Sequence, residues 1–319
     1  MSFSADVKEE LAGCKGKSRH CQIAQLAGIF AFCGHVVSRN GKSVFRIQTE
    51  NMAVVTSTVQ LIEAAFGKDA ISFSGEDCSK KGKVYIVECN NEQETIRILK
   101  AIKFLDESFN FMSGTGLVNN IVVQNTCCKR AFIRGAFLAA GSISDPEKFY
   151  HFEIVCQTKE KAQQMMDLLN HFDLDAKVVE RKKHFVVYIK EGDKIVDTLN
   201  IMEAYVALMK LENVRIVKEM RNNVNRQVNC ETANINKTVS AAVKQKEDIE
   251  YLMNTIGLEA LPVQLREIAQ LRLENSEASL KELGNMLSSP VGKSGVNHRL
   301  RKISILADEL REKKGGILQ

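Results

Sequence analysis

One stretch of this chain occurs twice, with an offset of 107 residues, and this duplication constrains the fold more than any other feature. The offset pairs Gly28 with Gly135 and Gly34 with Gly141. Further matches at the same offset are Phe30–Phe137, Phe45–Phe152 and Ile47–Ile154. We therefore expect one structural unit in two copies, at about 20–105 and about 127–212.

Each copy is expected to contain a helix, two strands, a helix, two strands and a final helix. In the first copy, apolar periodicity predicts helices over about 20–34 and 52–66 and strands near 71–74 and 83–89. The second copy has the same order of patterns. The predicted fold class is therefore α+β for this part of the chain.

Short motifs mark the turns and ends of these elements. Asn40-Gly41 is a hairpin turn signal, and Asn91 with Glu94 three residues later marks the start of the last helix of the first copy. The stretch "KVYIVEC" (83–89) resembles "VVYIKEG" (186–192) at an offset of 103. This smaller offset predicts a hairpin loop about four residues shorter in the second copy.

The first helix of each copy is rich in small residues. The small residues one turn apart are Ala24 and Gly28, Ala27 and Ala31, Gly135 and Ala139, and Ala136 and Ala140. Small side chains let two helix backbones approach closely, so we expect these two helices to pack against each other about a pseudo-twofold axis. The alternative is that each helix is buried independently.

These features resemble the LAGLIDADG homing-endonuclease fold, in which two such units form a saddle of β-strands around paired helices. "LAGIFAFCG" (26–34) matches the motif at its opening and its closing glycine, and "IRGAFLAAG" (133–141) keeps a glycine at both positions. In that family, the acid before the closing glycine holds the catalytic metal. The matching positions here are Cys33 and Ala140, which lack the hard oxygen ligands that Mg²⁺ prefers. The resemblance therefore implies the scaffold without catalytic residues.

Nine cysteines are scattered along the chain, and no C-x-x-C pair occurs. Five residues, Cys14, His20, Cys21, Cys33 and His35, can be considered as a zinc cluster, but their spacing is irregular. We interpret the cysteines as reduced, small hydrophobic residues and expect no metal ion and no cofactor.

Charge and hydropathy limit where the chain acts. The net charge is +5, and four of these charges lie from Arg215 onward, so the first two-thirds is nearly neutral. A nearly neutral region is a poor candidate for wrapping a polyanion by itself. No apolar run has the length of a membrane span, and the first residues do not resemble a signal peptide. We expect a cytoplasmic, nucleoid-associated protein with no membrane partner.

The last third differs in composition and is expected to form a separate all-α domain. We predict a duplicated domain at 1–217, an Asn-rich linker and helix at 218–247, and a helix-turn-helix domain at 248–319. The role of the Asn cluster at 221–236 is open. Asparagines can cap helices, bind phosphates or dock domains.

Three helical signals fall in the C-terminal domain. Pro262 suits a helix start, Ser279 with Glu282 forms a capping box, and "SSPVGKSG" predicts a turn. The helix-turn-helix is expected from about Ser279 to Leu310, and Gly284 would let its two helices cross tightly. The apolar stripe of the second helix is Val296, Leu300, Ile303, Ala307 and Leu310.

The opposite face of that second helix carries side chains suited to DNA. Ser294, Asn297, His298 and Arg301 are expected to face base edges, because Asn and Arg can bond adenine and guanine in the major groove. Lys293, Arg299 and Lys302 flank this face and are expected to meet phosphates. The alternative is an ordinary solvated basic face. The lack of any acid in 293–302 favours DNA contact.

The stretches "NRQVNCETANINKTVSAA" and "SLKELGNMLSSPVGKSGVNHRLRKI", after a degenerate duplicated domain, resemble the WhiA family. The resemblance implies a bacterial transcriptional regulator of cell division, chromosome segregation or sporulation, with a helix-turn-helix akin to sigma-factor region four. Double-stranded DNA is the expected partner, a protein partner could bind the duplicated domain, and we expect a monomer in solution. Two alternatives remain: a metal-dependent homing-type endonuclease with relocated ligands, and an architectural or partner-binding protein of the nucleoid or division machinery.

Overall fold

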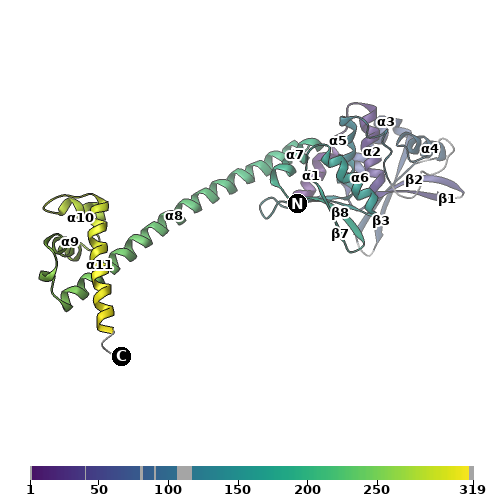
Figure 1. The fold of residues 1–319 in the computed structure, drawn as a ribbon. Helices are drawn as coiled ribbons and strands as arrows, with labels where there is room; N and C mark the ends of the chain where they lie inside the picture. Colours follow the sequence, from purple (N-terminus) through teal and green to yellow (C-terminus); the bar gives the residue numbers. More distant parts are fainter. Residues whose placement is uncertain (1, 40, 80–81, 90, 106–116, 316–319) are drawn as a thin grey trace. The chain divides into compact units, whose positions relative to one another are not determined.

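The structure, a computed structural model, describes residues 2–39, 41–79, 82–89, 91–105 and 117–315. Internal contacts divide the chain into two compact units, Met1–Glu219 and Met220–Gln319. Within the described residues, the first unit holds all the strands and the second unit is helical (Figure 1).

The first unit begins with helix α1 (Phe3–Ala12) and then contains the two predicted copies. The elements of the first copy are α2 (Arg19–Cys33), β1 (Gly34–Arg39), β2 (Lys42–Thr49), α3 (Met52–Phe66), β3 (Ile71–Ser79), β4 (Gly82–Cys89) and α4 (Glu92–Ala101). Those of the second copy are α5 (Thr126–Ala140), β5 (Gly141–Ile143), β6 (Phe152–Cys156), α6 (Lys159–Asn170), β7 (Lys177–Arg181), β8 (His184–Ile189) and α7 (Gly192–Met202). The predicted α+β fold with a duplicated order of elements is confirmed.

Each copy forms an antiparallel four-stranded sheet with the same strand order, β1-β2-β4-β3 in the first and β5-β6-β8-β7 in the second. The first two strands of each sheet pair in the same register, since Gly34 faces Ile47 in the first copy and Gly141 faces Ile154 in the second. Of the predicted Asn40-Gly41 turn, Gly41 has a φ of +75°, a conformation that favours glycine. Asn40 lies outside the described residues.

The register corrects the offset predicted for the last strand pair. Ile47 faces Val87 in the first sheet, whereas Ile154 faces Val187 in the second, so the offset between the copies is 100 residues at this strand and not 103. Sequence similarity misled here because both strands are runs of β-branched residues, which match each other at several offsets. The expected shorter loop is also wrong, because the last facing pair is Ser79 and Gly82 in the first sheet and Arg181 and His184 in the second, so two residues separate the strands in each copy. The second hairpin is shorter only in its strands.

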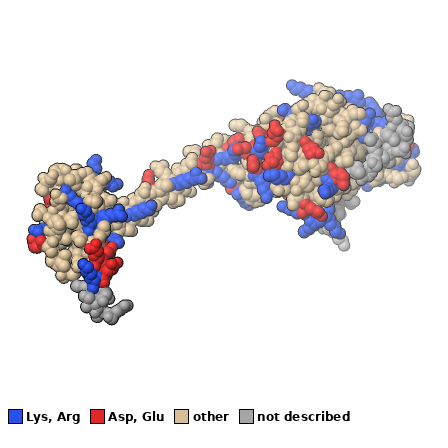
Figure 2. All heavy atoms as spheres, in the orientation of Figure 1, with Lys and Arg blue, Asp and Glu red and all other residues tan. Residues whose placement is uncertain are grey.

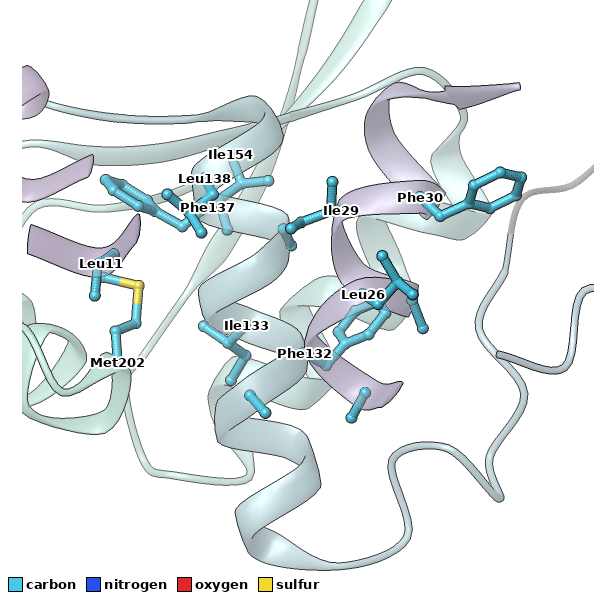
Figure 3. Packing of buried hydrophobic residues seen from close by; sticks show 14 of the residues in the cluster. Leu11, Leu26, Ile29, Phe30, Phe132, Ile133, Phe137, Leu138, Ile154 and Met202 are labelled. Atoms are coloured by element: carbon cyan, nitrogen blue, oxygen red, sulfur yellow. The ribbon is translucent and has the colours of Figure 1, made fainter. Parts of the chain in front are cut away.

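The paired packing of α2 and α5 is confirmed, and two glycines make it possible. A Cβ atom added to Gly28 would lie 2.4 Å from the carbonyl oxygen of Phe132, and one added to Gly135 would lie 2.1 Å from that of Gln25. Side chains of this contact, including Leu26, Ile29, Phe132 and Ile133, belong to one buried core (Figure 3). Backbone contact at these two positions therefore fixes where the helices cross.

Pairs of phenylalanines join each of these helices to its own sheet. Phe30 stacks on Phe45 with ring centroids 4.9 Å apart, and Phe137 stacks on Phe152 at 5.2 Å. All four residues were matched by the offset of 107. The duplication therefore extends to the packing of the core.

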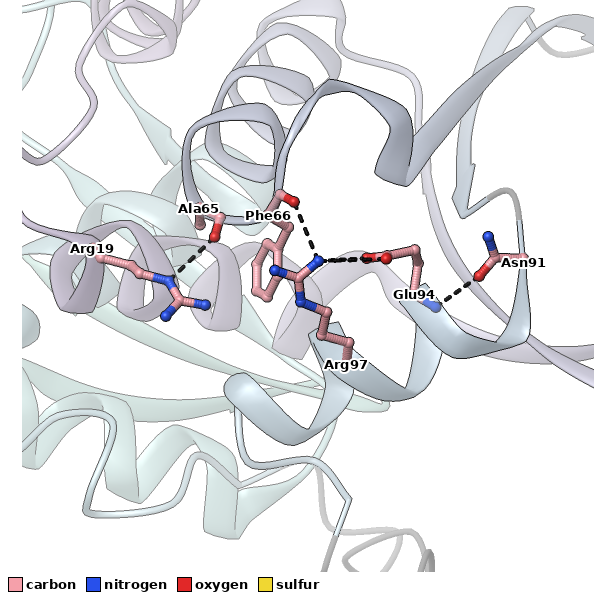
Figure 4. Close-up of polar contacts among 6 residues, drawn as sticks. All are labelled: Arg19, Ala65, Phe66, Asn91, Glu94 and Arg97. Atoms are coloured by element: carbon pink, nitrogen blue, oxygen red, sulfur yellow. Dashed lines mark hydrogen bonds and ion pairs between the residues drawn. The ribbon is translucent and has the colours of Figure 1, made fainter.

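Two arginines close the C-terminal end of α3 and connect it to its neighbours (Figure 4). Arg19, at the start of α2, donates to the carbonyl oxygen of Ala65, and Arg97 of α4 donates to that of Phe66. Both guanidinium groups lie 5.7 Å from the centre of the Phe66 ring. These contacts supply partners for carbonyls that a helix end leaves free, and they fix the first turn of α2.

The prediction that the Asn-rich stretch begins as a linker is wrong, because this stretch lies in the helix α8 (Tyr205–Thr255). Asparagine is a poor helix former, costing roughly 0.5 kcal/mol relative to alanine. No glycine or proline occurs within α8, however, so nothing in its sequence breaks the helix. No helix among the described residues is long and apolar enough to cross a membrane.

Candidate nucleic-acid interface

Three helices follow α8 in the second unit: α9 (Val263–Glu274), α10 (Leu280–Met286) and α11 (Lys293–Gly315). The predicted stripe of α11 faces their common core, where Val296, Leu300, Ile303 and Ala307 are buried and Leu310 is half-buried. Leu265, Ile268 and Ala269 of α9 and Leu283 of α10 pack into the same core. Burial of the stripe fixes which face of α11 is left for a ligand.

The first of the two crossing helices, α10, starts at the predicted capping box. The Ser279 hydroxyl accepts from the amide of Glu282 at 3.3 Å, and the Glu282 carboxylate accepts from the amide of Ser279 at 2.7 Å. Two otherwise free N–H groups are thereby satisfied. The capping box sets the point from which α10 approaches α11.

The turn from α10 to α11 packs closely against Gly284. The amide of Val291 donates to the carbonyl of Gly284 at 3.1 Å. A Cβ atom at Gly284 would lie 2.2 Å from the carbonyl oxygen of Val291 and 3.2 Å from the Val296 side chain. Glycine is thus required where the turn crosses α10.

The four side chains predicted to face bases lie on one side of α11, and all are exposed. Asn297, His298 and Arg301 follow Ser294 by three, four and seven residues, which places them on the same side of the helix as Ser294. Figure 2 shows Lys and Arg side chains over the first half of α11 and acidic side chains further along the helix. The exposed face therefore combines hydrogen-bonding groups with positive charge.

The three residues predicted to meet phosphates differ in their surroundings. Lys293 and Lys302 are exposed, whereas Arg299 is half-buried. The pKa of the Glu267 carboxyl group in α9 is lowered mainly by the hydrogen bond from the amide of Ser288, at 2.6 Å, and to a smaller extent by the positive charge of Arg299. Arg299 is thus less accessible to a ligand than the two lysines.

Two buried charged side chains hold parts of the second unit in place, and the sequence does not predict either of them. One contacts α11, and the other contacts the loop between α9 and α10. Asp248 of α8, only 1% exposed, pairs with Arg311 of α11 at 2.6 Å. Arg272, 2% exposed, donates to the carbonyl of Ala278 at 2.7 Å and so holds the loop between α9 and α10. The partners of the ion pair are 63 residues apart, and no local pattern in the sequence signals such a contact.

In the first unit, the positions corresponding to the metal-binding acids lie at the last residues of α2 and α5. The Cys33 thiol donates to the carbonyl of Ile29 at 3.3 Å, and burial raises its pKa to about 12. Lys8 of α1 faces this thiol, and burial lowers the pKa of its ammonium group to about 8. A neutral thiol, an alanine and a neighbouring lysine are a poor set of groups for holding Mg²⁺.

Family models match most of the chain. The WhiA N-terminal LAGLIDADG-like domain matches residues 19–105, the WhiA LAGLIDADG-like domain matches 129–221, and the WhiA C-terminal HTH domain matches 224–307. All seven residues of the predicted DNA face lie within the last of these matches.

Full-length relatives agree with these models. A probable cell division protein WhiA of Lachnoclostridium phytofermentans is 50% identical over 98% of this chain and 100% of its own. One from Alkaliphilus oremlandii is 49% identical over 98% of this chain and 99% of its own. The crystal structure of full-length WhiA from Thermatoga maritima is 25% identical, covers 97% of this chain and 99% of its own, and has a TM-score of 0.59. The chain therefore belongs to the WhiA family.

Proposed function

We propose that this protein is a non-catalytic DNA-binding transcriptional regulator of bacterial cell division, and that α11 is its recognition helix. The observation that carries the proposal is the exposed face of α11, which has no acidic residue in its first ten positions. Such a helix, supported by a capped helix and a tight turn, suits the width of the major groove.

The side chains of this face divide into two groups by their chemistry. Asn297 and Arg301 supply the bidentate groups that recognise adenine and guanine, with Ser294 and His298 beside them. Lys293 and Lys302 supply phosphate contacts that add affinity without sequence preference. Arg299 is half-buried, so its contact with a phosphate would be more restricted than those of the two exposed lysines.

The last residues of α2 and α5 lack the groups that a metal-dependent nuclease needs. Neither Cys33 nor Ala140 offers a carboxylate, and the thiol stays protonated at neutral pH because burial raises its pKa to about 12. Among the residues that the structure describes, no group of three or more ligand-type side chains includes either position. Two-metal phosphodiester cleavage depends on ions at the scissile phosphate, and these residues give such ions no support.

The cellular role is inferred from the relatives, which are named as probable cell division proteins. We place the protein in the cytoplasm on the nucleoid, acting as a monomer on genes of division, with chromosome segregation and sporulation as further targets. The duplicated unit would add a weak DNA surface or hold a protein partner, which its nearly neutral charge permits.

Replacing Arg301 tests the assignment of the reading face. A duplex selected from a random library by the full-length protein serves as the probe, and fluorescence anisotropy measures its affinity. Arg301→Ala should weaken specific binding by about 1–3 kcal/mol, because a bidentate contact with a base is lost. Lys313→Ala is the matched control, an exposed cation on the same helix roughly 18 Å further along.

Salt titration separates base contacts from phosphate contacts. Lys302→Ala should weaken binding to all duplexes similarly and reduce the slope of log affinity against log salt concentration by about 1. Equal affinities for the wild type, Arg301→Ala and Lys313→Ala would show that α11 does not read DNA.

A further inference from the structure

Four side chains with soft metal-binding atoms meet at the start of the paired helices α2 and α5. These residues are His20 and Cys21 of α2 and Cys127 and Cys128 of α5, and their ligand atoms all lie within 4.8 Å of one another. The Nδ1 atom of His20 is 3.2 Å from the Cys128 sulfur and 3.4 Å from the Cys21 sulfur. We call these four residues the helix-start cluster.

The duplication gives the helix-start cluster its symmetry. The offset of 107 that relates the two helices also relates His20 to Cys127 and Cys21 to Cys128. Each copy therefore contributes an equivalent pair of ligands, and the two pairs face each other across the pseudo-twofold axis. Two such pairs around a twofold axis generate a tetrahedron when they are turned relative to each other, which is the arrangement that zinc adopts with four protein ligands.

The distances between the ligand atoms are close to those around a zinc ion. In a tetrahedral site with Zn–S bonds of about 2.3 Å, neighbouring sulfur atoms are about 3.8 Å apart. The longest separations in the cluster exceed this value by roughly 1 Å, which a rotation of a cysteine side chain closes. Cys21 and Cys128 are buried, whereas His20 and Cys127 are exposed, so an ion can enter from solvent.

We propose that the helix-start cluster binds one structural zinc ion through His20, Cys21, Cys127 and Cys128. The three thiols bind as thiolates and release their protons to solvent, while His20 binds as neutral imidazole through Nδ1. Without a metal ion, burial raises the pKa of the Cys21 thiol to about 12 and also raises the pKa of the Cys128 thiol, so the zinc ion itself has to displace these protons. Four protein ligands leave no open position, so the ion serves structure and not hydrolysis.

The proposed ion holds the two copies together at the helix ends opposite Cys33 and Ala140. The first turn of α2 is already fixed by the hydrogen bond from Arg19 to Ala65, which presents His20 and Cys21 to the other helix. This proposal replaces the expectation that the protein has no metal site. It also differs from the cluster considered from sequence, because the thiol of Cys14 instead donates to the carbonyls of Glu10 and Glu203.

Metal analysis of the full-length protein tests the proposal directly. Protein purified under reducing conditions should contain one zinc ion per chain by elemental mass spectrometry. Cys127→Ser/Cys128→Ser should lose at least nine-tenths of the zinc. Cys230→Ser, which removes an exposed cysteine of α8, should keep it. Cobalt added to the metal-free protein should give the intense visible bands of tetrahedral thiolate coordination.

His20→Cys is a second variant that should fold like the wild type, because His20 is exposed and the variant retains four ligands. It therefore tests metal binding even if the double serine variant fails to fold. This variant should still bind zinc, and its sulfur-to-cobalt absorption should rise by about one third, since four thiolates replace three. Any of three results would overturn the proposal: wild-type protein with less than a tenth of an equivalent of zinc, equal zinc loss in Cys230→Ser, or a cobalt spectrum that His20→Cys leaves unchanged.

Discussion

Lys8 and Cys33 illustrate how burial alone changes the chemistry of a helix end. Burial lowers the pKa of the Lys8 ammonium group to about 8 and raises that of the Cys33 thiol to about 12. At neutral pH the thiol is therefore uncharged and the lysine beside it is still mostly protonated, where a nuclease would concentrate negative charge for its metal. The local environment, as well as the lost carboxylates, argues against Mg²⁺ at this position.

Lys8→Met tests this environment through the dependence of stability on pH. The pKa of Lys8 is lower in the folded state than its usual 10.5, so between these values the unfolded state binds more protons and wild-type stability rises with pH. Urea unfolding should find the variant more stable than the wild type at pH 7, by about 1–3 kcal/mol, with a smaller difference at pH 10. A difference that stays constant with pH would exclude a buried ammonium as its cause.

Ser279→Ala tests the capping box at the start of α10. The substitution removes the hydroxyl that accepts from the amide of Glu282, and it should lower the free energy of unfolding of the second unit by about 1 kcal/mol. Ser276→Ala, an exposed change in the preceding loop, is the control and should be nearly neutral. Equal stabilities of the two variants would mean that the cap contributes nothing.

At the scale of elements, the crossing of α2 and α5 depends on the absence of two side chains. Gly28→Ala would place a methyl group 2.4 Å from a backbone oxygen, and a backbone within a helix cannot move away easily. We expect a loss of about 3 kcal/mol in stability, seen as a lower Tm in calorimetry.

Gly13→Ala is the matched control in the same unit. Its Cβ atom would lie 3.5 Å from the nearest atom, and its φ of −77° suits alanine. This variant should be as stable as the wild type or slightly more stable. If Gly28→Ala has the same Tm as Gly13→Ala, the backbones of α2 and α5 do not approach each other as closely at Gly28 as they do in the structure.

Much of the fold could be predicted from local patterns, and the failures have physical causes. The offset of 107 predicted the paired helices, because glycines and phenylalanines at contact positions recur in both copies. The offset of the last strands was wrong because runs of β-branched residues match at several registers, and only the sheet selects one. The composition of the Asn-rich stretch favours a linker, but the stretch contains no helix breaker and continues α8.

The site itself was only partly accessible from sequence. Helical periodicity was enough to put Asn297 and Arg301 on the exposed face of α11. The half-burial of Arg299 and the buried pair of Asp248 with Arg311 depend on contacts between distant helices. Local spacing does not reveal the helix-start cluster, because its two pairs of ligands are separated by the repeat offset of 107 residues.

At the scale of the whole molecule, the chain combines a nearly neutral duplicated unit with a basic helical one. The net positive charge that steers a protein to DNA lies mainly in the last third, where the first half of α11 also provides an exposed face without acids. The proposed division of roles gives DNA reading to the second unit and a structural or partner-binding role to the first.

Genome-wide capture of DNA by the full-length protein tests this division most directly. Wild-type protein in the presence of Mg²⁺ should enrich discrete, uncut sites, and the double variant Asn297→Ala/Arg301→Ala should lose that enrichment while keeping the fold and stability of the wild type. If the variant enriches the same sites as the wild type, or if the wild type cuts the DNA it captures, α11 is not the reader or the duplicated unit is still a nuclease.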